Sequence, residues 1–327
     1  MKILYAIQGT GNGHISRARE IIPFLKKYGE VDLLISGTQA EVGLDDVVKY
    51  KFKGFGFVFG DKGGINFKKS WKEFDFKQFM KDCRSLPVEN YDVIINDFEP
   101  VTAWACKFKK KKSISLGHQG SFVSGKTPKP KGFHWGEMIL KNYAPASSYV
   151  AFHFEYYDDF IHTPVIRSEI RKLNSENFGH YTVYLPAYSD EFILSQIAEF
   201  PDIKWEIFSK HSKVLYQKNN AEVFPIENEK FTKSLEKCCG FLTGGGFEGP
   251  AEALFLNKKL LSVPMKNQYE QQCNALALEN LGIPVIWKES EFQEKLKQFV
   301  NSENKIKVNY PDETEGIIDS IFNQFLK

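Results

Sequence analysis

Residues 238–264 read "CCGFLTGGGFEGPAEALFLNKKLLSVP", and this stretch decides the fold. An apolar run of strand length is followed by a glycine turn, then by a helical pattern, then by a second apolar run. A strand, helix and strand in so short a span predict a βαβ unit, and therefore a parallel sheet. Proline suits the first turn of a helix, where its missing N–H is not needed, so we expect the helix to begin near Pro250.

The same stretch has the features of a phosphate site. The glycines allow backbone N–H groups to crowd around a diphosphate, and the positive end of the following helix points to the same place. Glu252 would lie in the first turn of that helix, where its carboxylate can accept both hydroxyls of a ribose. One strand later, "NQYEQQCNA" (267–275) supplies further polar groups. The sequence therefore predicts a nucleoside diphosphate site formed by Gly244, Gly245, Gly246, Phe247, Glu252, Glu270, Gln271 and Asn274.

The amino-terminal part repeats this organisation. Residues 2–9 are an apolar strand, residues 15–28 have apolar side chains at helical spacing, and residues 30–37 are the next strand. We expect an α/β protein with two doubly wound, Rossmann-like lobes that face a central cleft, where such folds bind ligands. The expected divisions are a first lobe over 1–163, a second lobe over 164–312, and a carboxyl-terminal helix over 313–327 that packs back on the first lobe.

Several classes of protein fit the sequence poorly. No apolar run approaches the roughly 18 residues of a membrane span. Gly9, Gly11 and Gly13 do not have the spacing of the nicotinamide-cofactor fingerprint, and the Gly-Lys-Ser/Thr of a P-loop is absent. The five cysteines lack the spacing of metal ligands, so we expect reduced cysteines, no metal and a cytoplasmic location.

Three segments resemble the GT-B glycosyltransferases, in the superfamily that spans families 1 and 28. Residues 244–275 resemble the donor-binding signature, "GTGNGHISRA" (9–18) is similar to the amino-terminal glycine turn, and "VIINDFEPVTAWA" (93–105) resembles the segment that carries an aspartate. The resemblance covers both lobes. It is strongest to a group of microbial glycosyltransferases, and it extends to the enzyme that adds N-acetylglucosamine to a lipid-linked peptidoglycan precursor.

The resemblance implies roles for individual residues. Glu252 would bind the ribose of a sugar nucleotide, and Glu270 and Gln271 would hold hydroxyls of the donor sugar. Family 1 enzymes usually begin the second glycine turn with a histidine that contacts the diphosphate, but Gly244 stands there in this chain. A second departure is the Asn-Lys-Lys of residues 257–259, which replaces a Gly-x-Pro and which we expect at a solvated helix end.

The resemblance also gives His14 a role in the first glycine turn. If the donor diphosphate binds the second lobe, His14 faces it across the cleft and acts as the general base that takes the proton of an acceptor hydroxyl. Asp97 would accept a hydrogen bond from the other ring nitrogen and stabilise the imidazolium. Direct attack of the acceptor oxygen on the anomeric carbon of the sugar inverts its configuration. Backbone N–H groups at the helix end stabilise the charge of the leaving diphosphate, so no divalent cation is required. The alternative is that His14 caps a helix or satisfies a buried hydrogen bond.

The acceptor side is less specified by the sequence. His118 and Gln119 end a strand and should face the cleft, either as contacts to acceptor or phosphate or as packing residues. The basic, aromatic residues 51–81 suit a lipid-linked acceptor or one at the inner face of the membrane, although they also suit an ordinary solvated helix. No nucleic-acid motif is present. The expected contacts to acceptor or phosphate are Gly11, Asn12, Gly13, His118 and Gln119.

The sequence analysis therefore favours an inverting, metal-independent transferase of the hexosyltransferase type. Its co-substrate would be a nucleotide sugar, in particular a uridine diphosphate (UDP) sugar, and no other cofactor is expected. Two alternatives remain open at this stage. A sugar-nucleotide epimerase of the same fold would form product from the donor alone, and a non-catalytic relative would bind a nucleotide without turnover.

Overall fold

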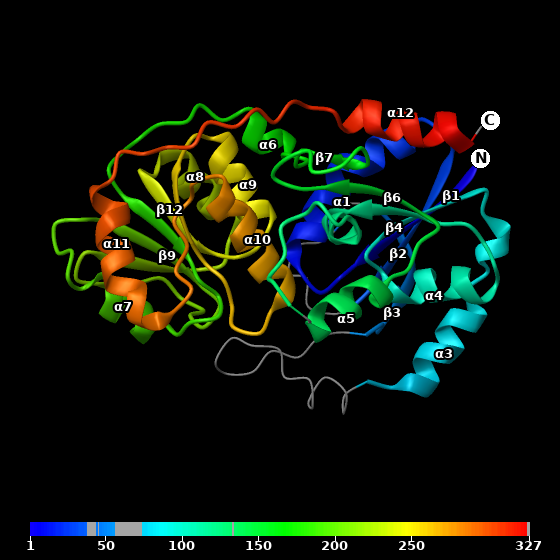
Figure 1. Ribbon diagram of the computed structural model, residues 1–327, viewed down its shortest axis with the longest axis horizontal. Helices are drawn as coiled ribbons and strands as arrows, with labels where there is room; N and C mark the ends of the chain where they lie inside the picture. Colours follow the sequence, from blue (N-terminus) through cyan, green and yellow to red (C-terminus); the bar gives the residue numbers. More distant parts are fainter. Residues whose placement is uncertain (38–43, 45, 56–73, 133, 326–327) are drawn as a thin grey trace.

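The computed structural model describes residues 1–37, 44, 46–55, 74–132 and 134–325. Two α/β lobes lie side by side, each built on its own sheet (Figure 1). The expected pair of Rossmann-like lobes is therefore confirmed. Residues 56–73 of the basic, aromatic segment lie outside the described residues. In the described part of the chain, no helix combines the length and apolar character needed to cross a membrane.

The first lobe has a parallel sheet of seven strands in the order β3-β2-β1-β4-β5-β6-β7. Side chains alternate across a strand, and β1 illustrates the result. Ile3, Tyr5 and Ile7 pack with α1, whereas Leu4 and Ala6 pack on the opposite face with α3 and α4. The elements of this lobe are β1 (Lys2–Gln8), α1 (Asn12–Leu25), β2 (Glu30–Ser36), β3 (Val48–Phe52), α3 (Phe76–Ser85), η1 (Val88–Asn90), β4 (Val93–Asp97), α4 (Pro100–Phe108), β5 (Ile114–Gly117), η2 (His118–Val123), α5 (Trp135–Tyr143), β6 (Ser148–Phe152) and β7 (Ile161–His162).

The second lobe has six strands in the order β10-β11-β9-β8-β12-β13, and β10 alone runs antiparallel to its neighbour among these strands. Val285, in the apolar residues 283–287, forms an isolated bridge with Ser262 at the edge of this sheet. The elements are α6 (Ser168–Arg171), β8 (Tyr181–Tyr184), α7 (Asp190–Ile197), β9 (Trp205–Ser209), β10 (Tyr216–Lys218), β11 (Ala221–Pro225), α8 (Asn228–Lys237), β12 (Gly240–Gly244), α9 (Glu248–Phe255), β13 (Lys259–Val263), α10 (Tyr269–Asn280), η3 (Glu289–Glu291) and α11 (Phe292–Asn301).

The chain returns to the first lobe at its end. Helix α12 (Thr314–Phe325) lies against α1, beyond a segment that runs along one edge of the molecule from α11 (Figure 1). The ring of Phe322 stacks on that of Tyr28 with 4.0 Å between the ring centroids, and the Tyr28 hydroxyl donates a hydrogen bond to Asp319. Lys27 and Glu315 form an ion pair at the same contact. Helix α12 therefore completes the apolar cover of the first sheet.

The expectation of solvated lysines at residues 258 and 259 is wrong. Both side chains are 2% exposed. The Lys258 ammonium donates to the backbone carbonyl oxygens of Glu176, Glu236 and Cys238, at 2.5, 2.5 and 3.0 Å. Lys259 donates to the hydroxyl of Tyr181 and to two carbonyl oxygens near the end of α11. The two lysines bind backbone carbonyl oxygens, most of which lie in or just after the last turns of α8 and α11, where helices leave carbonyl groups without an intrahelical partner.

We expect Lys258→Met to lower the free energy of unfolding by about 2–4 kcal/mol, because the methionine removes a buried charged donor from three carbonyl oxygens. Urea unfolding followed by circular dichroism measures the loss. The matched control is Lys297→Met, which removes an exposed lysine from α11 and should change stability by less than about 0.5 kcal/mol. An equally small change in both variants would mean that the buried ammonium contributes nothing to the fold.

Candidate active site

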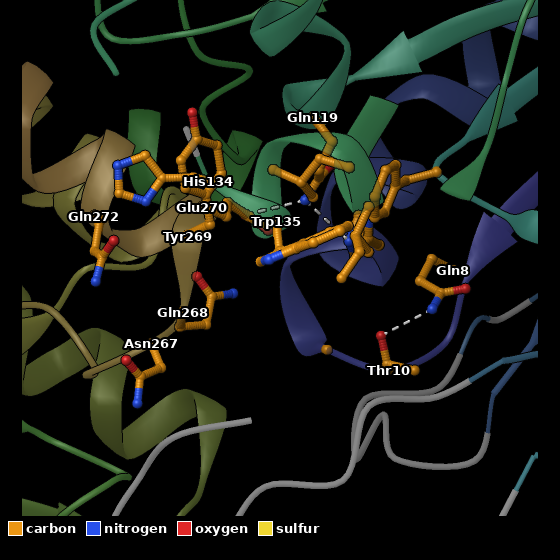
Figure 2. A pocket seen from close by; sticks show the side chains of 16 residues that line it. Gln8, Thr10, Gln119, His134, Trp135, Asn267, Gln268, Tyr269, Glu270 and Gln272 are labelled. Atoms are coloured by element: carbon orange, nitrogen blue, oxygen red, sulfur yellow. Dashed lines mark hydrogen bonds between the residues drawn. The ribbon is translucent and has the colours of Figure 1, made fainter. Parts of the chain in front are cut away.

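Two cavities open on the cleft between the lobes, where the carboxyl ends of the strands of both sheets meet. The first has a volume of about 660 Å³, and residues of both lobes line it, including Gln119 and Trp135 from the first lobe and Tyr269 and Glu270 from the second (Figure 2). The second has a volume of about 410 Å³ and lies between α1 and α9. A ligand with two parts could therefore be held on both sides of the cleft.

His14 lies in the first turn of α1 and lines the first cavity. Its Nδ1 is 2.8 Å from Oδ1 of Asp97, a fully buried carboxylate at the end of β4. When Nδ1 carries the proton, it donates to Asp97, and Nε2 then presents a lone pair. The amide nitrogen of Gln119 lies 3.5 Å from Nε2 and can donate to it. The arrangement leaves Nε2 as the ring nitrogen that can accept a proton.

Arg17, one helical turn after His14, holds Asp97 from the other side. Its Nη2 donates to Oδ1 and Oδ2 at 2.7 and 2.8 Å, and its Nε donates to Oδ2 at 3.1 Å. Burial alone would raise the pKa of Asp97, but the charges of Arg17 and His14 outweigh it, and the pKa lies below its ordinary value. Asp97 is therefore ionised at neutral pH and fixed in position by the guanidinium.

Phe98 lies beside this pair in an unusual backbone conformation, with its ring next to those of His14 and Tyr143. It follows Asp97 directly and has a φ of 56°, a left-handed conformation that bulky residues rarely adopt. Its ring lies parallel to that of His14, with 6.5 Å between centroids, and stacks on Tyr143 at 4.7 Å. Backbone strain of this kind persists where surrounding contacts impose it, and it is frequent at functional sites.

The second glycine turn is held in shape by α10. Oε1 of Gln271 accepts hydrogen bonds from the backbone N–H groups of Gly245 and Met265, at 3.2 and 3.0 Å. The amide of Asn274 donates to the carbonyl oxygen of Gly245, while its Oδ1 lies 2.8 Å from Nε2 of His118. Gln271, which the resemblance assigns to the donor sugar, therefore contacts the glycine turn, and Asn274, expected in the donor site, contacts both the turn and the first lobe.

The two lobes also meet through aromatic and polar contacts next to the first cavity. The ring of Phe247 stacks on that of His118, with 3.9 Å between centroids and 4° between planes. The amide of Gln119 donates to the carboxylate of Glu270 at 3.1 Å (Figure 2). Burial raises the pKa of Glu270, against the opposing effects of the His14 charge and the Gln119 hydrogen bond. His118 is buried, whereas Gln119 and Glu270 border the cavity.

Glu252 borders the second cavity, in the second turn of α9, because that helix begins at Glu248 and not near Pro250. Its carboxylate accepts two hydrogen bonds from Arg167, from Nε to Oε1 at 2.5 Å and from Nη2 to Oε2 at 2.8 Å. Burial raises the pKa of Glu252 even though Arg167 acts in the opposite direction. A carboxylate has about four acceptor positions, so lone pairs remain for further donors.

Glu248 is a residue that the sequence did not single out. It lies in the first turn of α9 and forms an ion pair with Nη1 of Arg17 on the facing lobe. Surrounding protein raises the pKa of its carboxyl group to about 7, although about a fifth of the side chain, 21%, stays open to the second cavity. The ion pair between Arg17 and Glu248 crosses the cleft.

The predicted residues divide into three groups. Gly11, His14, Gln119 and Glu270 border the first cavity; Asn12, Gly13 and Glu252 border the second. Asp97, His118, Gly244, Gly245, Gly246, Phe247, Gln271 and Asn274 stand outside both linings, behind or beside those residues. Arg17, Arg167 and Glu248 were missed, and the sequence signal that could have found Arg17 is its place one turn after His14. Among the described residues, no group of three or more His, Cys, Asp or Glu side chains is arranged to hold a metal ion.

Comparisons with known proteins show the family and the fold of the chain. A family model described as glycosyl transferase family 1 matches residues 1–303. Among solved structures, MurG of Acinetobacter baumannii is 13% identical with a TM-score of 0.59, and the alignment covers 98% of this chain and 99% of that one. Phytolacca americana UGT2, complexed with UDP-2-fluoro-glucose and pterostilbene, is 11% identical with a TM-score of 0.60, with 98% and 93% covered.

A UDP-glucosyltransferase from Polygonum tinctorium is 12% identical with a TM-score of 0.58, and the alignment covers 99% of this chain and 94% of that one. At such low identity these likenesses show the fold alone, which is GT-B. No curated protein sequence matches the chain. Because the family model spans nearly the whole sequence, the protein belongs to glycosyl transferase family 1 and is a glycosyltransferase.

Proposed function

We propose that the protein is an inverting, metal-independent glycosyltransferase that moves a sugar from a UDP-sugar to an acceptor hydroxyl. The observation that carries the proposal is the His14–Asp97 pair, in which His14 borders the first cavity and Asp97 lies behind it, while the glycine turn and Glu252 lie across the cleft on the facing lobe. The complex of a structural neighbour, Phytolacca americana UGT2, with UDP-2-fluoro-glucose and pterostilbene is consistent with the choice of nucleotide.

The donor would lie with its ribose on Glu252 and its diphosphate at the amino end of α9. The acceptor hydroxyl, bound in the first cavity, attacks the anomeric carbon as its proton passes to Nε2 of His14. The new bond forms between the acceptor oxygen and that carbon, the bond to the diphosphate oxygen breaks, and the diphosphate leaves with the electron pair. Attack opposite the leaving group inverts the anomeric configuration. The imidazolium that forms is stabilised by Asp97.

The first cavity also suggests how the sugar and the acceptor are bound. Glu270 and Gln119 form its polar side and can accept from and donate to sugar hydroxyls. Trp135, Ile139 and Leu140 of α5 form an apolar side. An acceptor with an apolar portion next to its reacting hydroxyl, such as a lipid-linked one, fits these two sides.

The test begins with thermal unfolding of the protein in the presence of UDP, ADP, GDP and dTDP. UDP is expected to raise the midpoint most, because ligand that binds only the folded state stabilises it. UDP-glucose, UDP-N-acetylglucosamine and UDP-galactose are then incubated with and without a membrane extract, and products are followed by mass spectrometry. Transfer only with the extract supports the proposal. Conversion of donor alone indicates an epimerase, and binding without turnover indicates a nucleotide-binding relative.

A further inference from the structure

Arg17 and Glu248 occupy the centre of the proposed donor site, where the described residues place five charged groups together. Two guanidinium groups, of Arg17 and Arg167, face three carboxyl groups, of Asp97, Glu248 and Glu252. A fully ionised cluster would carry an excess negative charge, and a diphosphate would bring about two more. An anionic ligand can therefore enter only if a carboxylate moves away or takes a proton.

Glu248 is the carboxyl group that a ligand can displace, because fewer hydrogen bonds hold it than hold Asp97 or Glu252. Asp97 accepts from Nε and Nη2 of Arg17 and from His14, and Glu252 accepts two bonds from Arg167. Glu248 is joined to Arg17 through Nη1 alone and borders a cavity of about 410 Å³ into which its side chain can turn.

The amino-terminal turns of α1 and α9 approach closely at this point. A Cβ atom built on Gly13 would come within 2.8 Å of Cγ of Glu248. The glycine turn before α9, residues 244–247, supplies backbone groups but no cationic side chain. A positive side chain for a leaving diphosphate must therefore come from elsewhere, and Nη1 of Arg17 already points to the first turn of α9, where its partner is Glu248.

We propose that Glu248 holds Arg17 in the empty protein as a stand-in for the donor diphosphate. On binding, the β-phosphate displaces this carboxylate and takes over the Nη1 end of the guanidinium, while Nε and Nη2 of Arg17 stay on Asp97. Arg17 then binds the diphosphate with a charge-assisted hydrogen bond and ties it to the carboxylate that orients His14. This inference rests on the proposed function.

The displaced carboxyl group should give donor binding a dependence on pH. The titratable and charged groups around Glu248 and its cavity are His14, Arg17 and Arg19 on α1, Tyr5 on β1, Asp97 at the end of β4, Arg167 before α6, Glu227 before α8, and Glu252 on α9. Because surrounding protein raises the pKa of Glu248 to about 7, its carboxyl group is mostly ionised at pH 8 and mostly protonated at pH 6. Competition with the diphosphate is therefore strong at pH 8 and weak at pH 6.

The experiment is calorimetric titration of UDP into the natural protein and Glu248→Gln at pH 8 and pH 6. We expect Glu248→Gln to bind UDP about tenfold more tightly than the natural protein at pH 8, and less than about threefold more tightly at pH 6. Because the two proteins are compared at the same pH, the protonation of UDP itself affects both measured affinities equally. The control is Glu20→Gln, which removes a carboxylate from α1 that bonds to Ser168 and does not border this cavity. Its UDP affinity should be unchanged.

Arg17→Lys provides the second arm, with UMP as a probe that lacks the β-phosphate. We expect the variant to bind UDP about tenfold more weakly and UMP less than about threefold more weakly, because lysine cannot hold Asp97 and a phosphate at once. If the natural protein binds UDP but Glu248→Gln binds it no more tightly at pH 8, the inference is wrong and the proposed function stands. If none of the four nucleoside diphosphates binds the natural protein, both fail.

Discussion

A His14→Ala variant should transfer sugar about a thousandfold more slowly than the natural protein while binding UDP with nearly the same affinity. General-base catalysis contributes about 10²- to 10⁴-fold, and alanine removes the group that takes the proton. His14 lies next to the cavity proposed for the acceptor, whereas Glu252 and the glycine turn lie on the facing lobe, so the donor contacts should survive. Initial rates with saturating donor give kcat, and calorimetry with UDP gives the affinity.

The control for this variant is His211→Ala, which removes an exposed histidine of the second lobe. It should leave kcat within about twofold of the natural value. A His14→Ala protein that is folded, binds UDP and transfers at the natural rate would exclude His14 as the base. The structure would then assign the pair with Asp97 to the stability of the first glycine turn.

The second large effect is expected for Asp97→Asn, which should lower kcat about 10²- to 10³-fold. The asparagine amide cannot accept from His14 and from both donors of Arg17, so the imidazole loses the partner that fixes its tautomer. The variant also leaves a buried guanidinium without its carboxylate, which costs about 3–5 kcal/mol of stability. Circular dichroism and UDP affinity establish that the protein assayed is folded.

The double variant His14→Ala, Asp97→Asn separates a catalytic pair from two independent residues. If Asp97 acts through His14, the double variant transfers no more slowly than His14→Ala alone, because groups that act as a unit are strongly non-additive. If the fold-reductions in kcat of the two single variants multiply in the double variant, Asp97 contributes to catalysis independently of His14. The dependence of the free energy of unfolding on pH adds a further test. Arg17 and His14 hold the pKa of Asp97 below its ordinary value near 3.9, so the carboxylate is ionised above that pH. The stability that it contributes is lost only as the pH falls through the lower pKa in the folded protein.

The fold could be predicted because its signals are local. A glycine turn between an apolar strand and an amphipathic helix occurs twice, at residues 9–13 and 244–246, and each predicts a parallel βαβ unit without knowledge of the rest of the chain. The start of α9 was placed too late, since Pro250 suits any position of the first turn and Glu248 begins the helix two residues earlier. Lys258 was misplaced because the carbonyl oxygens that bind it come from separate segments.

The site was predictable only in part for the same reason. The pattern of glycines, His14 and Glu252 can be read along the sequence, whereas the partners of the charged groups cannot. Arg17 meets a carboxylate 231 positions away, and Arg167 meets one 85 positions away. An arginine without a visible partner is normally a solvated surface residue. The place of Arg17 one turn after His14 was a signal for it, whereas no sequence rule favoured Arg167.

The return of α12 to the first lobe has a consequence for motion. The chain crosses between the lobes twice, through the segment around α6 and through residues 302–313, and both crossings run along the same edge (Figure 1). Arg171 donates to the carbonyl oxygens of Tyr310 and Pro311, so the crossings are bonded to each other. These two bonded segments therefore connect the lobes along one edge. A rotation of one lobe against the other about an axis along this edge would widen the cleft on the opposite side, where substrates would enter and leave.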